Sequence, residues 1–178
     1  MRGAPGREAS AAGLIRHLQL LPHPEGGHYR ETYRSREQVQ TRRGPRAAST
    51  AILFLLAAGE HSSWHRIASD EVWLHHGGGA LLIYELSAAG QARCTRLGLD
   101  FEGGERPQHV VPGGSWFAAE PLPGKDWSLV GCTVAPGFEF SDFELARAEQ
   151  LADGADQLAT LCGHWQQLLS PGSASPGS

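Results

Sequence analysis

The segment AGEHSSWHRIASDEVWLHHGGG, residues 58–79, decides the fold because it places two strand patterns and several ionisable side chains next to each other. Successive side chains of a β-strand point to opposite faces, so His65 and Ile67 share one face of the first strand. Glu71 and Trp73 share one face of the second. The segment is compatible with a metal site, a metal-free acid/base site, or a polar lining without turnover.

Short strand patterns continue on both sides of this segment. Glycine and proline, with 23 and 11 copies, separate them into turns. We expect strands over residues 28–35, 49–58, 61–67, 71–76, 80–86, 92–97, 109–111, 115–119, 128–135 and 138–143. Because no helical crossover segment lies between them, an all-β antiparallel sandwich or barrel is predicted.

Helical patterns flank the strands. Ser10 can cap a short helix whose apolar stripe begins at Ala11, and a second helix is expected over residues 144–152. A solvated, arginine-rich loop is expected to carry Arg34, Arg36, Arg42, Arg43 and Arg46. The predicted organisation is a disordered N-terminus (1–9), one β-domain (10–152), an extra C-terminal helix (153–169) and a disordered tail (170–178).

Composition limits the class of partner. The net charge of −4 gives no broad positive field for nucleic acid, and the longest apolar run is too short to span a bilayer. Cys94, Cys132 and Cys162 are odd in number and far apart, which argues against a disulfide framework and a thiolate zinc site. We expect a cytoplasmic protein with no nucleic-acid or membrane partner.

The opening segment resembles the first motif of the cupin superfamily, in which a glycine precedes a histidine, a second histidine and a glutamate. Gly59, His65 and Glu71 occupy three of these positions, while Ile67 replaces the second histidine. In the second cupin motif, PGGSWF, Phe117 stands where a histidine is usual. Two of the three imidazole ligands of a metal-binding cupin are therefore absent.

Three longer motifs sharpen the resemblance. HPEGGHYRETY at 23–33, HRIASDEVW at 65–73 and PGGSWF at 112–117 are similar to an uncharacterised cupin-like family, a domain of unknown function. The resemblance covers roughly residues 14–150. It implies a double-stranded β-helix, or jelly-roll, barrel with short terminal helices, a homodimer, and a pocket at one mouth of the barrel.

In this pocket the chemistry favoured is metal-free. A histidine beside a glutamate in an apolar cavity can act as a general base, so His65 is the predicted base and Glu71 the residue that orients it. This resembles metal-free cupin epimerases that act on nucleotide-sugars. The predicted substrate-binding residues are Tyr29, Arg30, Glu31, Tyr33, Arg66, Trp73, His75 and Phe117.

No cofactor is expected, because Ile67 and Phe117 remove nitrogen donors and a catalytic metal usually needs three or more protein ligands. If a metal does bind, His65, Glu71 and His75 are the residues expected to hold it. The first interpretation is an isomerase or epimerase acting on a small polar, sugar- or nucleotide-like ligand. Two alternatives stay open: a non-catalytic small-ligand binding protein, and a metal-dependent, oxygenase-like enzyme with a rebuilt ligand set.

Overall fold

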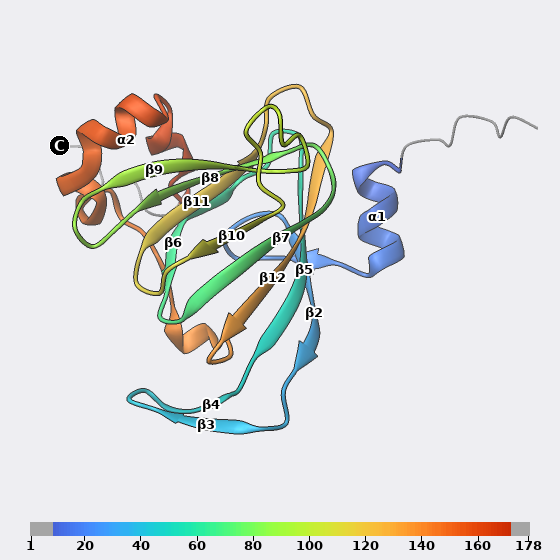
Figure 1. The fold of residues 1–178 in the computed structure, drawn as a ribbon, viewed down its shortest axis with the longest axis vertical. Helices are drawn as coiled ribbons and strands as arrows, with labels where there is room; N and C mark the ends of the chain where they lie inside the picture. Colours follow the sequence, from blue (N-terminus) through green and yellow to red (C-terminus); the bar gives the residue numbers. More distant parts are fainter. Residues whose placement is uncertain (1–8, 172–178) are drawn as a thin grey trace, which may run out of the picture.

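The computed structural model describes residues 9–171, and its main strands form two antiparallel sheets that face each other (Figure 1). The first sheet has the order β1 (Leu21–Pro22), β2 (His28–Arg34), β5 (Thr50–Ala57), β12 (Trp127–Ala135), β7 (Asp70–Gly78) and β10 (Gln108–Val111). The second has the order β13 (Phe143–Leu145), β6 (Ser62–Ile67), β11 (Trp116–Pro121), β8 (Leu81–Leu86) and β9 (Ala92–Leu97). The all-β architecture predicted from the sequence is confirmed. Most of the predicted disordered segments, 1–9 and 170–178, lie outside the described residues.

The main hydrophobic core lies between the two sheets. Phe54, Trp73 and Cys132 of the first sheet meet Ile83 and Phe117 of the second, and each is at most 2% exposed. The alternation of side chains along each strand directs one residue in two into this layer. Burial of each large side chain contributes roughly 1.5–3 kcal/mol to folding.

A second core covers the outer face of the second sheet. Helical turns η2 (Ala148–Gly154), α2 (Ala155–Leu161) and η3 (Trp165–Leu168) form a C-terminal extension that lies beside β8 and β9 (Figure 1). The extension packs Leu158 and Trp165 against Trp64 and Trp116 of the sheet. The indole Nε1 of Trp64 also donates to the backbone oxygen of Trp165 at 2.9 Å. The region predicted as one helix over 153–169 is thus divided into separate turns.

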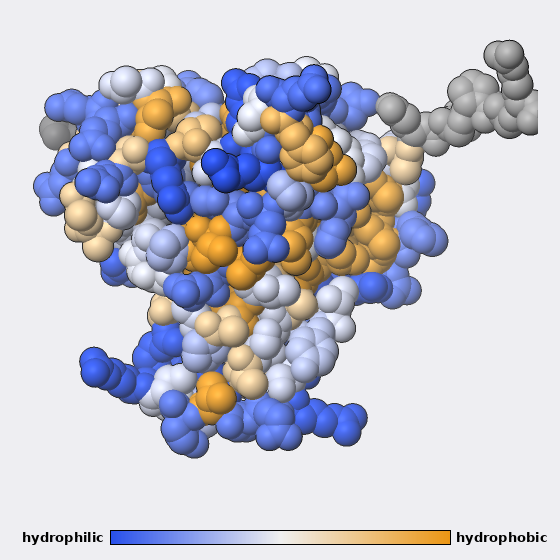
Figure 2. Space-filling model, in the orientation of Figure 1, coloured by the Kyte–Doolittle hydropathy of each residue, from blue (hydrophilic) through white to orange (hydrophobic). Residues whose placement is uncertain are grey.

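The first helix begins where the sequence predicts. Ser10 is the N-cap of α1 (Ala11–Leu18), and its hydroxyl accepts a hydrogen bond from the Gly13 backbone at 3.1 Å. Gln19 ends the helix with a left-handed backbone, at φ 55°. No helix among residues 9–171 combines the length and the apolar character needed to cross a membrane. In Figure 2 the apolar side chains on the face shown gather over its middle, where β7, β10 and β12 lie in Figure 1.

The segment expected to be an arginine-rich loop contains a hairpin instead. Strands β3 (Gln38–Thr41) and β4 (Gly44–Ala47) pair as a separate two-stranded sheet. Arg46 fixes this hairpin to the domain, because its guanidinium donates to both carboxylate oxygens of Asp142 at 2.8 Å. The prediction missed the hairpin because its strands carry polar residues on both faces and show no apolar alternation.

The predicted strand over residues 138–143 and the predicted helix over 144–152 are also wrong in type. The first contains the 3₁₀ turn η1 (Phe140–Asp142), and the second begins with the end of β13 and continues as the 3₁₀ turn η2. The spacing of the three phenylalanines in this region imitates strand alternation. In the structure these rings instead pack against one another and form one wall of a cavity.

Candidate functional site

A cavity of about 310 Å³ lies between the sheets. This volume suits a small molecule. The predicted site residues that line the cavity are Tyr29, Glu31, His65, Glu71 and Trp73. Residues 138–143 supply a further wall of aromatic side chains. The fold therefore brings both predicted catalytic residues to one enclosed and largely apolar space.

His65 lines this cavity and is held in one tautomer. Its ring Nδ1 lies 2.7 Å from the backbone oxygen of Ser63, and its Nε2 lies 3.2 Å from Oε2 of Glu25. A backbone carbonyl can only accept a hydrogen bond, so Nδ1 carries the proton and the Nε2 lone pair faces Glu25. Burial lowers the pKa of His65 to about 3, and the imidazole is neutral at physiological pH.

Glu25 is the residue of the candidate site that the sequence analysis missed. Its Oε1 accepts a hydrogen bond from the Ser62 hydroxyl at 3.0 Å, and the residue is 7% exposed. Burial, followed by the charge of Glu71, raises the pKa of Glu25 well above its ordinary value. The Nε2 lone pair of His65 needs a donor to form a hydrogen bond, so a protonated Glu25 carboxyl would donate to it. The direct partners of His65 are thus Ser63 and Glu25, where the sequence favoured Glu71.

A glycine pair after Glu25 sets its position. Gly26 and Gly27 have φ values of +110° and +68°, a region that side chains with a Cβ rarely adopt. A Cβ at Gly26 would lie 2.1 Å from the backbone oxygen of His61. In the sequence analysis the PEGG sequence served only as part of a family motif. Its two glycines were the available signal that the neighbouring carboxyl enters a tightly packed turn.

His23 adds a second neutral imidazole beside Glu25. Its Nδ1 accepts a hydrogen bond from the Glu25 backbone at 3.3 Å and lies 3.5 Å from the Glu25 carboxyl. Its ring makes an edge contact with Tyr29, with centroids 4.5 Å apart. Burial lowers the pKa of His23 to about 4. The inner end of the cavity thus holds two imidazoles and carboxyl groups with little positive charge.

Glu71 is the second buried carboxyl of the cavity. It lies on β7, is 7% exposed, and burial raises its pKa to about 7. The Cys132 thiol and the Trp73 indole are its polar neighbours and partly oppose this rise. Within the described part of the chain, Trp73 Nε1 is buried without a partner in hydrogen-bond geometry. This buried N–H faces Glu71 without completing a hydrogen bond to it, so an acceptor oxygen of a ligand bound beside Glu71 can become its partner.

Charged residues gather at another part of the cavity wall. Arg34 donates to Glu31 at 2.8 and 3.0 Å and to Glu139 at 2.6 Å. All three residues line the cavity. The guanidinium is already shared between two carboxylates, so its charge is locally neutralised.

Two predicted ligand-binding residues on β2 lie away from the cavity. Arg30 points to the other face of the strand, where it donates to Gln19 at 3.3 Å. Tyr33 is 54% exposed, because the pairing of β2 with β5 shifts between Glu31 and Tyr33 and interrupts the alternation. Of the β2 candidates, Tyr29 and Glu31 line the cavity.

Arg66 and His75 also lie outside the cavity lining. Arg66 follows His65 on the strand and faces the opposite side, where it contacts Glu144 at 2.7 Å and stacks 4.4 Å over the Trp116 ring. His75 lies four residues beyond Glu71, or roughly 13 Å along β7. Its Nε2 is 3.1 Å from the Gly79 backbone oxygen.

Comparison with known proteins agrees with this architecture. Residues 12–146 match the family model Cupin_5, described as Cupin superfamily (DUF985). The chain belongs to the cupin superfamily. An uncharacterised protein of Saccharomyces cerevisiae is 31% identical to this cupin over 179 residues, which covers 89% of this chain and 83% of the yeast protein.

Solved structures place the fold of this cupin in the same group. A protein of Shewanella oneidensis is 41% identical with a TM-score of 0.80, covering 91% of this chain and 98% of its own. An oxalate decarboxylase mutant of Bacillus subtilis is 15% identical with a TM-score of 0.56, covering 88% of this chain and 40% of its own. At that identity the likeness concerns the fold alone. The predicted cupin jelly-roll barrel is confirmed.

The metal that the fold family implies does not fit the inherited positions of this cupin. Ile67 and Phe117 place hydrocarbon where two imidazoles would be needed, and the Phe117 ring packs 4.0 Å from the His65 ring. His65 keeps its Nε2 lone pair directed at Glu25, and His75 is too far along β7 to join it. The groups that remain, neutral imidazoles and two buried carboxyls, are suited to proton transfer.

Proposed function

We propose that this cupin is a metal-independent isomerase that moves a proton between neighbouring carbons of a small sugar-like molecule. The observation that carries the proposal is the pair of buried carboxyls, Glu25 and Glu71, on one cavity. The charge of Glu71 raises the pKa of Glu25, so Glu71 loses its proton first. When the surroundings of two carboxyls give them different pKa values, one can act as the general acid and the other as the general base.

In this proposal Glu71 is the base. A pKa of about 7 leaves a substantial carboxylate fraction at neutral pH while keeping the group basic enough to accept a proton. His65, the base favoured from the sequence, has a pKa of about 3 and is too weak a base for this step. His65 is instead a positioning residue, which holds the Glu25 carboxyl through its Nε2.

The proposed reaction balances with these two carboxyls. Glu71 takes the proton from the carbon next to the carbonyl, the C–H electron pair forms the enediol double bond, and the carbonyl oxygen takes the Glu25 proton. Glu71 then returns its proton to the former carbonyl carbon, and the adjacent hydroxyl gives its proton back to Glu25. In the proposed reaction the buried Trp73 Nε1, which faces Glu71, donates to a substrate oxygen.

The charge of the cavity favours an uncharged ligand. Four glutamates line it, and Arg34 is engaged by Glu31 and Glu139. The diphosphate of a nucleotide-sugar would meet carboxylates without a free cationic partner. The aromatic walls and neutral acid groups suit the carbon skeleton and hydroxyl groups of a free sugar or a related hydroxycarbonyl compound.

A ligand screen followed by isotope exchange tests the proposal. Free sugars, hydroxycarbonyl compounds and nucleotide-sugars are compared by thermal shift, since a ligand at 100 times its Kd stabilises by about 2.7 kcal/mol. Ligands that bind are incubated in deuterated water and followed by NMR. We expect deuterium to enter the carbon next to the carbonyl, and Glu71→Gln to abolish this exchange while binding remains.

The matched control is Glu102→Gln, which changes an exposed carboxyl and should leave exchange unaffected. Binding without exchange in the unmodified protein would contradict catalysis and favour the non-catalytic binding protein. Exchange that persists in Glu71→Gln would exclude Glu71 as the base. Stabilisation by nucleotide-sugars alone would contradict the charge argument.

A further inference from the structure

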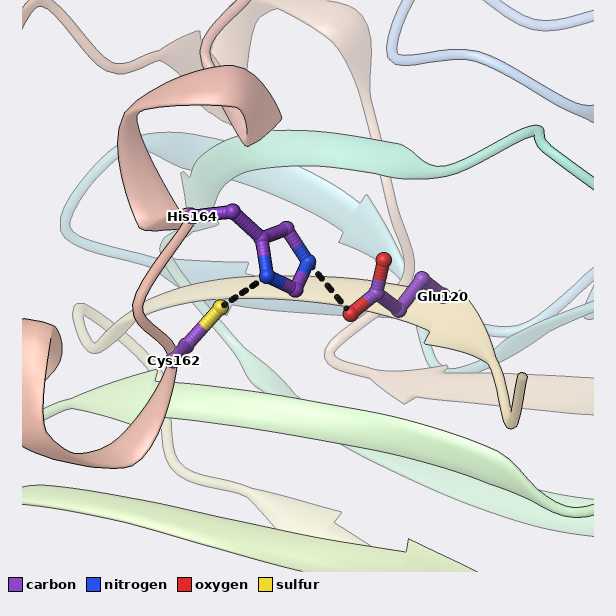
Figure 3. A group of neighbouring side chains, drawn as sticks. All are labelled: Glu120, Cys162 and His164. Carbon is purple, nitrogen blue, oxygen red and sulfur yellow. Dashed lines mark hydrogen bonds and ion pairs between the residues drawn. The ribbon is translucent and has the colours of Figure 1, made fainter.

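A cluster of three metal-ligand side chains lies on the covered outer face of the second sheet, opposite the face that packs between the sheets. Glu120 comes from β11, Cys162 follows α2, and His164 precedes η3 (Figure 3). Cys162 and His164 belong to the C-terminal extension, beyond the residues 12–146 that match the cupin family model. The cluster therefore joins the extension to the barrel.

The His164 ring lies between the other two side chains and contacts each through a different nitrogen (Figure 3). Nε2 of His164 lies 2.9 Å from Oε1 of Glu120, and Nδ1 of His164 lies 3.8 Å from Sγ of Cys162 (Figure 3). Taking one ligand atom from each residue, all three atoms lie within 4.8 Å of one another. Among residues 9–171, no other group of three histidine, cysteine, aspartate or glutamate side chains meets this condition.

We propose that Glu120, Cys162 and His164 bind a divalent transition-metal ion, with zinc the best match. Thiolate, imidazole and carboxylate are the three ligand types that zinc uses in proteins. In a tetrahedral zinc site a sulfur and a nitrogen ligand are roughly 3.6 Å apart, given Zn–S and Zn–N bonds of about 2.3 and 2.1 Å. The observed Sγ to Nδ1 separation of 3.8 Å is close to this value. Glu120, which contacts the other nitrogen of the ring, must turn toward the ion to complete the site, and the ligand atoms of all three residues lie within 4.8 Å of one another.

The surroundings leave room for that adjustment. The His164 side chain is 43% exposed and that of Glu120 is 18% exposed, so an ion can enter from solvent and both side chains can rotate. The Tyr84 hydroxyl donates to Oε1 of Glu120 at 2.9 Å and orients this carboxylate. Such a partner is typical of the groups that position metal ligands. A solvent water would complete the fourth position.

Binding exchanges a proton for the ion. The Cys162 thiol gives its proton to solvent, and its sulfur electron pair forms the metal–sulfur bond. The sequence analysis argued against a thiolate zinc site from the spacing of the cysteines. That argument could not detect this site, because two of its three ligands are not cysteines. The ion would hold Cys162 and His164 of the extension on the barrel strand that carries Glu120.

Cobalt(II) is the probe that tests the proposal, because a cobalt–thiolate bond gives a charge-transfer absorption band in the near ultraviolet. The full chain, reduced and freed of metal with a chelator, is titrated with cobalt and then with zinc. We expect the band to saturate at one cobalt per chain and to disappear when zinc displaces cobalt. Cys162→Ser should lose the band, while Cys94→Ser, which changes an exposed thiol, should keep it.

Two histidine variants, one at the proposed site and one away from it, provide the second readout. His164→Ala should weaken cobalt binding by more than about tenfold, because losing even a group that only orients a metal ligand costs roughly 10–100-fold. His17→Ala, which removes an exposed histidine on α1, should leave binding unchanged. Circular dichroism of each variant checks that it is folded. The proposal is overturned if no saturable band forms, if the band survives in folded Cys162→Ser, or if Cys94→Ser abolishes it.

Discussion

Replacing Glu71 by glutamine should stabilise the protein progressively as the pH rises from 5 to 8. Burial raises the pKa of Glu71 from 4.5 to about 7, so the folded protein holds this proton more tightly than the unfolded chain. The favourable contribution is complete below pH 4.5 and is lost as the pH rises toward 7. Glutamine is close in shape to the neutral acid and cannot ionise.

The size of the effect follows from the shift. Each pKa unit corresponds to about 1.4 kcal/mol, and the part of the shift that falls between pH 5 and pH 8 amounts to about 2.5 kcal/mol. The free energy of unfolding of Glu71→Gln, relative to the unmodified protein, should therefore rise by about this amount over the interval. His23 and His65 titrate in both proteins, so their contributions largely cancel in the difference.

Urea unfolding at pH 5, 6.5 and 8, followed by tryptophan fluorescence, measures this difference. Glu102→Gln, at an exposed position, should show a difference that does not change with pH. A flat difference for Glu71→Gln as well would refute the assignment of a raised pKa. It would also remove the reason for naming Glu71 as the base.

Three further predictions concern stability. Gly27→Ala should destabilise the protein by about 2 kcal/mol or more, because a Cβ there would lie 2.8 Å from a backbone oxygen at φ +68°; the control Gly163→Ala has no atom within 4 Å of its Cβ. Trp165→Ala should cost about 3–5 kcal/mol in urea unfolding, because the ring fills the second core, and a loss below 1 kcal/mol would contradict that packing. Between pH 6.5 and about 4 the His23 imidazole is neutral in the folded protein but takes up a proton on unfolding, so the unmodified protein loses stability as the pH falls. His23→Gln should lose less stability over this interval, and His17→Gln should follow the unmodified protein.

Strands with a clear apolar pattern were predictable from the sequence. The uninterrupted apolar run of β5 and the alternation in β6 were recognised because their burial follows the period of a strand. The β3–β4 hairpin was missed because its strands lack apolar alternation, and its contact with the domain, between Arg46 and Asp142, joins residues far apart in the chain. Long-range contacts of this kind leave no local pattern in the chain.

The candidate site was predictable only in part, for the same reason. Motif position placed His65 and Glu71 on one cavity, but the partner of His65 comes from a turn 40 residues earlier in the chain. Strand alternation already places Arg66 opposite His65, and applying it strictly would have excluded Arg66 from the cavity. Tyr33 required knowledge of the shift in β2 pairing, which the sequence does not indicate.

The aromatic contact between the extension and the second sheet makes the C-terminal extension part of the smallest unit of this chain that should fold on its own. The family match stops at residue 146, yet Trp64 and Trp116 obtain their cover from residues well beyond it. A chain shortened to the matched region would leave two indole rings facing water on a broad sheet surface, and such a fragment should self-associate. For this cupin, truncation experiments should keep everything through Leu168.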